Sequence, residues 1–146
     1  MNKLKLVVAS CLFFFITSCD DEKVIGGSDL PQAAQAFIST HFPGESITRA
    51  VKDTEGKTEY DVRLSNGFKL EFNSAGEWRE IEGFGIEIPL TIQDELPPSI
   101  LAYVSDNHST QLITKLEIDR GNYEVYLIGG LEIVFSSTGD FIRYDD

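Results

Sequence analysis

The feature that most constrains the fold is a pattern of seventeen residues that occurs twice. It first reads YDVRLSNGFKLEFNSAG, at residues 60–76, and it returns as YEVYLIGGLEIVFSSTG at residues 123–139. Both copies alternate apolar and polar residues around a glycine-containing turn and end at a second glycine, which is typical of a β-hairpin. Because a duplicated pattern indicates a repeated structural unit, we expect two copies of one hairpin-containing unit.

A helix is expected before each hairpin. Leu30-Pro31 and Leu96-Pro97 stand 66 residues apart, and proline suits the first turn of a helix. Ser28 or Asp29 can cap the first helix, and Phe42-Pro43-Gly44 should end it. The residues at helical spacing on its apolar face are Ala34, Phe37, Ile38 and His41.

Strands should fill the rest of each unit. Residues 46–52 and 77–82 alternate in the manner of strands before and after the first hairpin. The expected turns are at residues 54–57, 66–67 and 74–76. The residues of the first hairpin expected to face the core are Tyr60, Val62, Leu64, Phe68, Leu70 and Phe72.

The fold class predicted from these elements is α+β. It comprises two tandem helix-plus-four-stranded antiparallel meander repeats, at residues 30–82 and 96–146, with a linker at 83–95. Pro89 argues against a central strand in that linker. Units of just over fifty residues are marginal on their own. We therefore expect the repeats to form one continuous sheet with both helices on one face.

Residues 1–18 are expected to be a lipoprotein signal peptide. Lys3 and Lys5 precede an apolar run, Leu6–Ile16, which is shorter than the roughly 20 residues that span a membrane. The run leads into Ile-Thr-Ser-Cys, which resembles the lipobox of bacterial lipoproteins. The resemblance implies cleavage before Cys19 and lipidation of its sulfur. The alternative is an ordinary signal peptide that contains an unrelated cysteine.

Residues 19–29 are expected to form a flexible tether. The acids that follow Cys19 resemble signals that export some Gram-negative lipoproteins to the cell surface. In other Gram-negative groups, aspartate at this position is linked to retention in the inner membrane, and both alternatives stay open. The predicted location is the cell envelope, lipid-anchored through Cys19, on the periplasmic or cell-surface side of the outer membrane.

The charge balance excludes several function classes. Cleavage removes Lys3 and Lys5, which leaves 10 of the 12 basic residues against 24 acids and a net charge of −14. Such acidity argues against nucleic acid as a partner. Cleavage would also leave Cys19 as the one cysteine, so no disulfide can form within the chain.

No catalytic, metal or cofactor site is expected from the motifs. His41 and His108 are the two histidines, and they do not occupy equivalent positions, because they are 67 residues apart and the two helices are offset by 66. The sequence contains no zinc or calcium motif and no nucleophile elbow. An enzyme is therefore disfavoured. The oligomeric state stays open.

The order of motifs in the first unit resembles the PepSY-like domain family, described as β-lactamase-inhibitor-like. The motifs that carry the resemblance are Leu30-Pro31, His41-Phe42-Pro43, Ile47-Thr48, Tyr60-Asp61-Val62, Asn66-Gly67, Phe72 and Gly76-Glu77-Trp78. The second unit departs at Ser109, Gly129 and Phe141, where the first has proline, asparagine and tryptophan. The resemblance covers residues 30–146. It implies tandem helix-plus-sheet units, secreted or membrane-anchored, with a concave sheet face able to hold a partner.

The sheet face turned away from the helices is the candidate binding site. The first unit should expose Asp61, Arg63, Lys69 and Glu71 there. The second should expose Glu124, Tyr126, Ile128, Glu132 and Val134. Three apolar residues in places where polar ones are expected often mark a contact site. The alternative is that the linker or a neighbouring helix covers them. Trp78 and Phe141 fit either face.

The leading hypothesis is a lipid-anchored, extracytoplasmic binding module that holds a protein or peptide on this face, with inhibition as one outcome. The alternative is a structural or accessory subunit of an envelope assembly without inhibitory activity. The identity of the partner does not follow from the residues.

Overall fold

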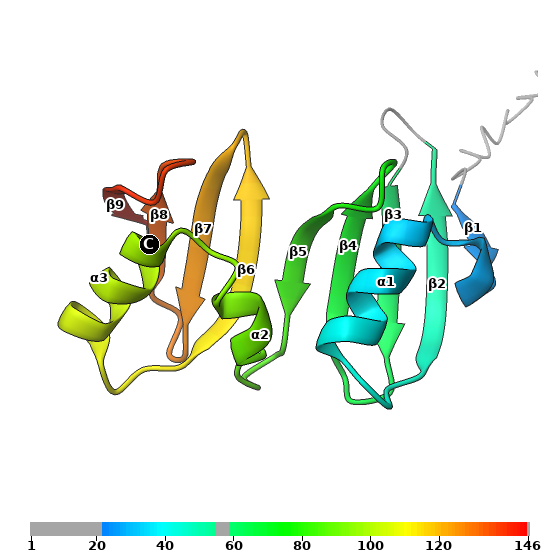
Figure 1. Cartoon of the computed structure of the whole chain (residues 1–146), viewed down its shortest axis with the longest axis horizontal. Helices are drawn as coiled ribbons and strands as arrows, with labels where there is room; N and C mark the ends of the chain where they lie inside the picture. Colours follow the sequence, from blue (N-terminus) through cyan, green and yellow to red (C-terminus); the bar gives the residue numbers. More distant parts are fainter. Residues whose placement is uncertain (1–21, 55–58, 146) are drawn as a thin grey trace, which may run out of the picture.

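The protein is built on one antiparallel sheet of nine strands, joined in chain order from β1 to β9 (Figure 1). The computed structural model describes residues 22–54 and 59–145. The expected signal peptide and Cys19, the expected lipidation site, therefore lie outside the described residues, as does most of the turn expected at 54–57. The strands are β1 (Lys23–Ile25), β2 (Ile47–Asp53), β3 (Glu59–Leu64), β4 (Lys69–Asn73), β5 (Trp78–Glu82), β6 (Ile113–Asp119), β7 (Asn122–Leu127), β8 (Glu132–Phe135) and β9 (Phe141–Asp145).

The helices pack on one face of this sheet (Figure 1). They are the 3₁₀ turn η1 (Gly27–Asp29) and the α-helices α1 (Gln32–His41), α2 (Leu90–Gln93) and α3 (Pro98–His108). The Phe37 ring of α1 meets Phe72 of β4 at 5.8 Å between centroids. Tyr103 of α3 meets Phe135 of β8 at 5.5 Å in the same edge-on manner. No helix among the described residues is long and apolar enough to cross a membrane.

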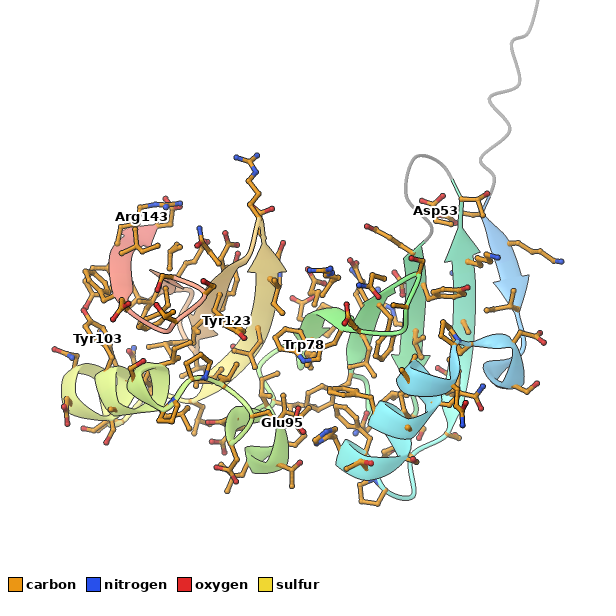
Figure 2. All side chains as sticks on the ribbon, turned by 45° about the horizontal axis from the view of Figure 1, so that its top comes forward. Asp53, Trp78, Glu95, Tyr103, Tyr123 and Arg143 are labelled. Carbon is orange, nitrogen blue, oxygen red and sulfur yellow. The ribbon has the colours of Figure 1, made fainter. Side chains whose placement is uncertain are left out.

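A single hydrophobic core runs through both halves of the molecule. At the junction, β5 pairs with β6, and Ile81 lies opposite Leu116. Both side chains are fully buried and belong to the same core cluster as the apolar residues of α1 and α3. Figure 2 shows Trp78 and Tyr123 near the same junction, with their rings 6.5 Å apart. The expectation of one continuous α+β sheet is therefore confirmed.

Two glycines let the helix N-termini approach the sheet. Gly76 has φ +84°, and a β-carbon there would lie 2.8 Å from the backbone nitrogen of Ala34. Gly139 has φ +87°, and a β-carbon there would lie 2.6 Å from the β-carbon of Pro97. The turn after β4 thus packs directly on the start of α1, and the turn after β8 on the start of α3, with no room for a side chain at either glycine.

β-Bulges decide which face the last strand of each half presents. The register of β4 with β5 shifts between Glu71 and Phe72, so Trp78 lies opposite the buried Phe72. The register of β8 with β9 shifts in the same way, and Phe141 lies opposite Phe135. Both aromatic residues, which the sequence allowed on either face, are therefore on the helix side.

Two expectations about the fold were wrong. Eight strands were expected, but Lys23–Ile25 of the supposed tether pairs with β2 as a ninth strand. Neither Ser28 nor Asp29 caps α1: its N-cap is Pro31, and Asp29 instead accepts a hydrogen bond from the Gly26 amide at 3.0 Å. The linker, for which no helix was expected, contains α2, which buries Ile92 against the core.

Candidate binding face

The sheet surface opposite the helices, here called the open face, is formed by every second residue of the strands. Val62 and Leu70 lie opposite each other, and both are buried on the helix side. Because side chains alternate along a strand, the residues before and after each of them point to the open face. The outward side chains of the central strands are mostly charged. They are Asp61, Arg63, Lys69, Glu71, Glu80, Glu82, Lys115, Glu117, Glu124, Tyr126 and Glu132.

A row of carboxylates crosses the middle of the open face. Asp61 lies opposite Glu71, and Glu71 lies opposite Glu80. The row continues across the junction, where Glu80 lies opposite Glu117 and Glu117 opposite Glu124. Like charges in directly opposed positions destabilise a sheet. The row therefore depends on positive charges from the neighbouring positions.

Lys69 and Lys115 supply those charges. The Lys69 ammonium contacts Glu71 and lies 3.0 Å from Glu80. The Lys115 ammonium lies 2.9 Å from Glu80 and 3.0 Å from Glu117. Burial alone would lower the pKa of each lysine, but the hydrogen bonds to these carboxylates outweigh it and raise the pKa of both. Both lysines stay charged and fixed in place.

Glu80 is the centre of this network. Its side chain is 13% exposed and binds one lysine from β4 and one from β6. Burial raises the pKa of Glu80, but the hydrogen bonds from Lys115 and Lys69 reverse the effect and leave the pKa below its ordinary value. The carboxylate thus ties together the strands on both sides of the β5–β6 junction.

The acidic row has no ion pair at its β7 end. Tyr126 is half-buried there, with the Lys115 ammonium 4.7 Å from the centre of its ring. The Tyr126 hydroxyl donates a hydrogen bond to Glu124 at 3.2 Å. Burial, and then the charges of Glu132 and Glu117, raise the pKa of Glu124. No lysine or arginine of the described chain lies within ion-pair distance of Glu124 or Glu132.

The prediction of an exposed apolar patch on this face was wrong. Val134 lies between Glu124 and Arg143 on the neighbouring strands, but it is only 1% exposed. It is not part of the core cluster on the helix side. Ile128 is 43% exposed but follows the end of β7, in the turn before β8. Tyr126 is half-buried. These three residues therefore form no continuous exposed patch. Asp61, Arg63, Lys69, Glu71 and Glu132 do lie on the open face as expected, and their binding role stays a prediction.

One hollow on the open face, about 230 Å³, is lined by Arg49, Val51, Asp61 and Arg63. Two others border the face. The larger, about 800 Å³, is lined by carboxylates of the row, including Glu71, Glu80 and Glu117, together with Arg79 and Arg120. The smaller, about 220 Å³, lies between the loop that carries Phe84 and the turn that carries Ile128.

Phe84 is a surface residue that the sequence analysis missed. It is 58% exposed, has the unusual φ of 49°, and lies 5.5 Å from the guanidinium of Arg63. Its signal in the sequence is an aromatic residue flanked by two glycines, Gly83 and Gly85, outside any strand pattern.

The histidines have structural partners. His41 is buried at the end of α1, where Nδ1 lies 3.0 Å from the Thr91 hydroxyl and Nε2 lies 3.2 Å from Glu95. His108 is half-buried, with Nε2 3.1 Å from the Tyr144 hydroxyl. Within the described ranges, no three His, Cys, Asp or Glu residues are placed to hold a metal ion.

Comparisons with known proteins give one family and a common fold. A model of the family described as "Putative beta-lactamase-inhibitor-like, PepSY-like" matches residues 58–143. A protein from Bacteroides vulgatus, described as a putative periplasmic protein of the DUF2874 family, is 37% identical, with 88% of this chain and 99% of that chain covered and a TM-score of 0.80. A second B. vulgatus protein, described as a putative periplasmic protein of unknown function, is 34% identical, with coverage of 86% and 99% and a TM-score of 0.80.

A Bacteroides thetaiotaomicron protein described as a putative calcium-regulated periplasmic protein is 32% identical, covers 87% of this chain and 98% of its own, and has a TM-score of 0.80. Among curated proteins, none matches the chain significantly.

Proposed function

This chain belongs to the PepSY-like family, and from that premise we propose that it is an extracytoplasmic binding module that holds a protein or peptide on its open face. The observation that carries the proposal is the open face itself, which no described helix covers and whose charges are held in fixed positions by Lys69 and Lys115. Fixed charges favour specific binding because little ordering remains to be done when a partner arrives. The family is not one of known enzymes.

The charge of the face suggests the chemistry of the partner. Lys69 and Lys115 offset only part of the acidic row, and Glu124 and Glu132 form no ion pair among the described residues. Arg143 attracts both carboxylates but is itself paired with Asp145. Burial and like charges raise the pKa of Glu124, which indicates that its charge is poorly compensated. A partner with lysine or arginine side chains would relieve this repulsion.

The proposed location is the periplasmic or cell-surface side of the outer membrane, with Cys19 as the lipid anchor. Support comes from the signal-like residues 1–18 and from relatives described as periplasmic. Four peptide units separate Cys19 from Lys23, where β1 begins, and they span at most roughly 14 Å. An anchor at Cys19 would therefore hold this edge of the sheet close to the membrane.

We further propose that residues 30–82 and 96–146 are two copies of one unit. Matched features support this. Gly76 and Gly139 have the same conformation and each meets the helix that begins its own half. The first strand of each half has a bulge at an equivalent position, near Arg49 and near Lys115.

The binding proposal can be tested with two variants of equal charge. Soluble protein that begins at Asp20 is immobilised and exposed to envelope extract. The double substitution Glu124→Lys and Glu132→Lys on the open face should abolish capture of the partner. The control, Glu87→Lys and Asp106→Lys, makes the same change in net charge at exposed sites outside the sheet and should preserve capture. Equal capture by both variants, or equal loss, would refute the open face as the site.

A separate assay distinguishes an inhibitor from an accessory subunit. The purified protein is added to β-lactamases and envelope peptidases, and residual activity is measured. Inhibition that disappears with the Glu124→Lys and Glu132→Lys protein would identify the open face as inhibitory. Face-dependent capture without inhibition would favour an accessory role in an envelope assembly.

A further inference from the structure

One edge of the sheet is left open by strand β9. The strand order places β1 and β9 at the two edges, and β8 is the one described neighbour of β9. A strand in this position presents backbone N–H and C=O groups that another strand can pair with. Proteins usually protect such edges by short length, lysine or proline, or by covering them.

The two edges differ in their protection. β1 has three residues and begins with Lys23. β9 has five residues, contains neither lysine nor proline, and exposes Phe141, Ile142 and Tyr144 by 41%, 45% and 44%. The bulge opposite Phe135 affects the start of β9 only, because Arg143, Tyr144 and Asp145 pair regularly with β8. β9 is therefore the edge suited to strand addition.

We propose that β9 pairs with β9 of a second copy of this chain, in antiparallel register about a two-fold axis at Tyr144. This proposal goes beyond the binding function above, since it requires no other partner. Arg143 and Asp145 both point to the open face, as their partners Val134 and Glu132 do. Within one chain, the Arg143 guanidinium already donates hydrogen bonds to the Asp145 carboxylate. In the proposed register, Arg143 of each copy also lies opposite Asp145 of the other, so the two intrachain pairs join across the axis into one cluster of four alternating charges.

The charges also select this register over its neighbours. Moving the axis by one residue toward the start of β9 places Arg143 opposite its own copy, and moving it by one residue toward the end does the same with Asp145. Directly opposed like charges destabilise a sheet. The charge pattern of β9 is thus complementary to itself in one alignment.

Side chains behind β9 hold it ready for pairing. The Tyr144 hydroxyl lies 2.8 Å from that of Tyr103 and 3.1 Å from Nε2 of His108. The rings of Phe141 and Tyr103 stack at 4.8 Å with 8° between their planes. Figure 2 shows Tyr103 on α3 and Arg143 on β9 at the same end of the molecule. Because β9 is already ordered, pairing loses little conformational entropy.

The proposed dimer would extend the open face. A two-fold axis perpendicular to the sheet keeps the open faces of both copies on the same side, and the sheet doubles its nine strands. The contact involves one short strand from each copy and is smaller than a standard interface of about 1,600 Å². We therefore expect weak association, with a dissociation constant of about 10–100 µM.

Charge reversal tests the register. Purified protein that keeps every described residue is studied by sedimentation equilibrium over a range of concentrations. The wild type should shift from monomer to dimer. R143D and D145R should each remain monomeric, because each places like charges opposite one another. An equimolar mixture of R143D and D145R should form a heterodimer, since both opposed pairs are then complementary.

Each result decides the proposal. Both side chains are about half exposed, so the variants should fold normally, which circular dichroism can verify. Failure of the wild type to dimerise at concentrations about tenfold above the expected dissociation constant overturns the proposal. Association that survives both single substitutions, or single variants that do not associate when mixed, overturns it as well, because the contact then lies elsewhere.

Discussion

Neutralising Glu80 is the sharpest test of what holds the two halves of the sheet together on the open face. The substitution Glu80→Gln keeps the shape of the side chain and removes its charge. Glu80 binds Lys69 of β4 at 3.0 Å and Lys115 of β6 at 2.9 Å, so one change weakens two ion pairs. We expect the folded state to become less stable at neutral pH.

The magnitude follows from the burial of the group. Exposed ion pairs contribute about 0–1 kcal/mol, whereas breaking a fully buried pair costs about 3–5 kcal/mol. Glu80 is 13% exposed, and its lysine partners are 18% and 21% exposed, so the network lies between these limits. Each lysine keeps a second carboxylate, Glu71 or Glu117, which reduces the loss. We expect a decrease in the free energy of unfolding of about 1–2 kcal/mol.

The pH dependence has a definite sign. The pKa of folded Glu80 is below its ordinary value of 4.5, because the lysine hydrogen bonds outweigh the effect of burial. A carboxylate with a lowered pKa contributes stability that is present above the unfolded pKa and is lost as the pH falls through the folded pKa. The difference between wild type and Glu80→Gln should therefore be full at pH values well above 4.5 and vanish at acid pH.

Thermal unfolding followed by circular dichroism measures the effect. For a domain of this size, the expected loss corresponds to a decrease in Tm of about 4–8 °C. Glu82→Gln is the matched control, because Glu82 lies on the same strand and face but has no ion pair among the described residues. It should change stability by less than about 0.5 kcal/mol. A Glu80→Gln protein that is as stable as the wild type at neutral pH, or whose loss of stability persists in acid, would refute this role of Glu80.

Three further predictions concern packing, repulsion and the shared core. Gly76→Ala should lower the free energy of unfolding by about 2–5 kcal/mol, because strain at positive φ adds to a clash with α1. The control Gly67→Ala, where the new β-carbon meets open space at φ +94°, should lower it by only about 1–2 kcal/mol. Urea unfolding measures both. Glu124→Gln should raise Tm at pH 7, and the gain should disappear as the pH falls below the raised folded pKa, since the protonated carboxyl is then equally free of repulsion. Residues 30–82 expressed alone should be largely unfolded, as judged by circular dichroism, because Ile81 would lose its cover from Leu116; a fragment as stable as the whole protein would contradict the shared core.

Much of the secondary structure was predictable because it follows from local patterns. The helical spacing of Ala34, Ile38 and His41 correctly placed a buried face on α1. Asn66-Gly67 correctly located the turn between β3 and β4, where Gly67 has φ +94°. Such signals depend on a few neighbouring residues and need no knowledge of distant contacts.

The binding face was less predictable because it depends on neighbours that the sequence does not reveal. Val134 has the position of an outward residue, between Glu124 and Arg143, yet its side chain is only 1% exposed. Trp78 could not be assigned to a face, since the β4–β5 bulge shifts the alternation by one residue. β1 went unrecognised, because three residues carry too little pattern to indicate a strand without its partner β2.

The sequence by itself determined the order of the two longer helices and of strands β2 to β9, the turn at Asn66-Gly67 and the acidity of the chain. These depend on local conformational preference and on composition. Only the tertiary structure decided that Glu80 would face lysines from strands on both sides of it, and that β9 would be left open at the edge. Cross-strand neighbours are set by register, and register is fixed when a shared core forms between segments that lie far apart in the chain.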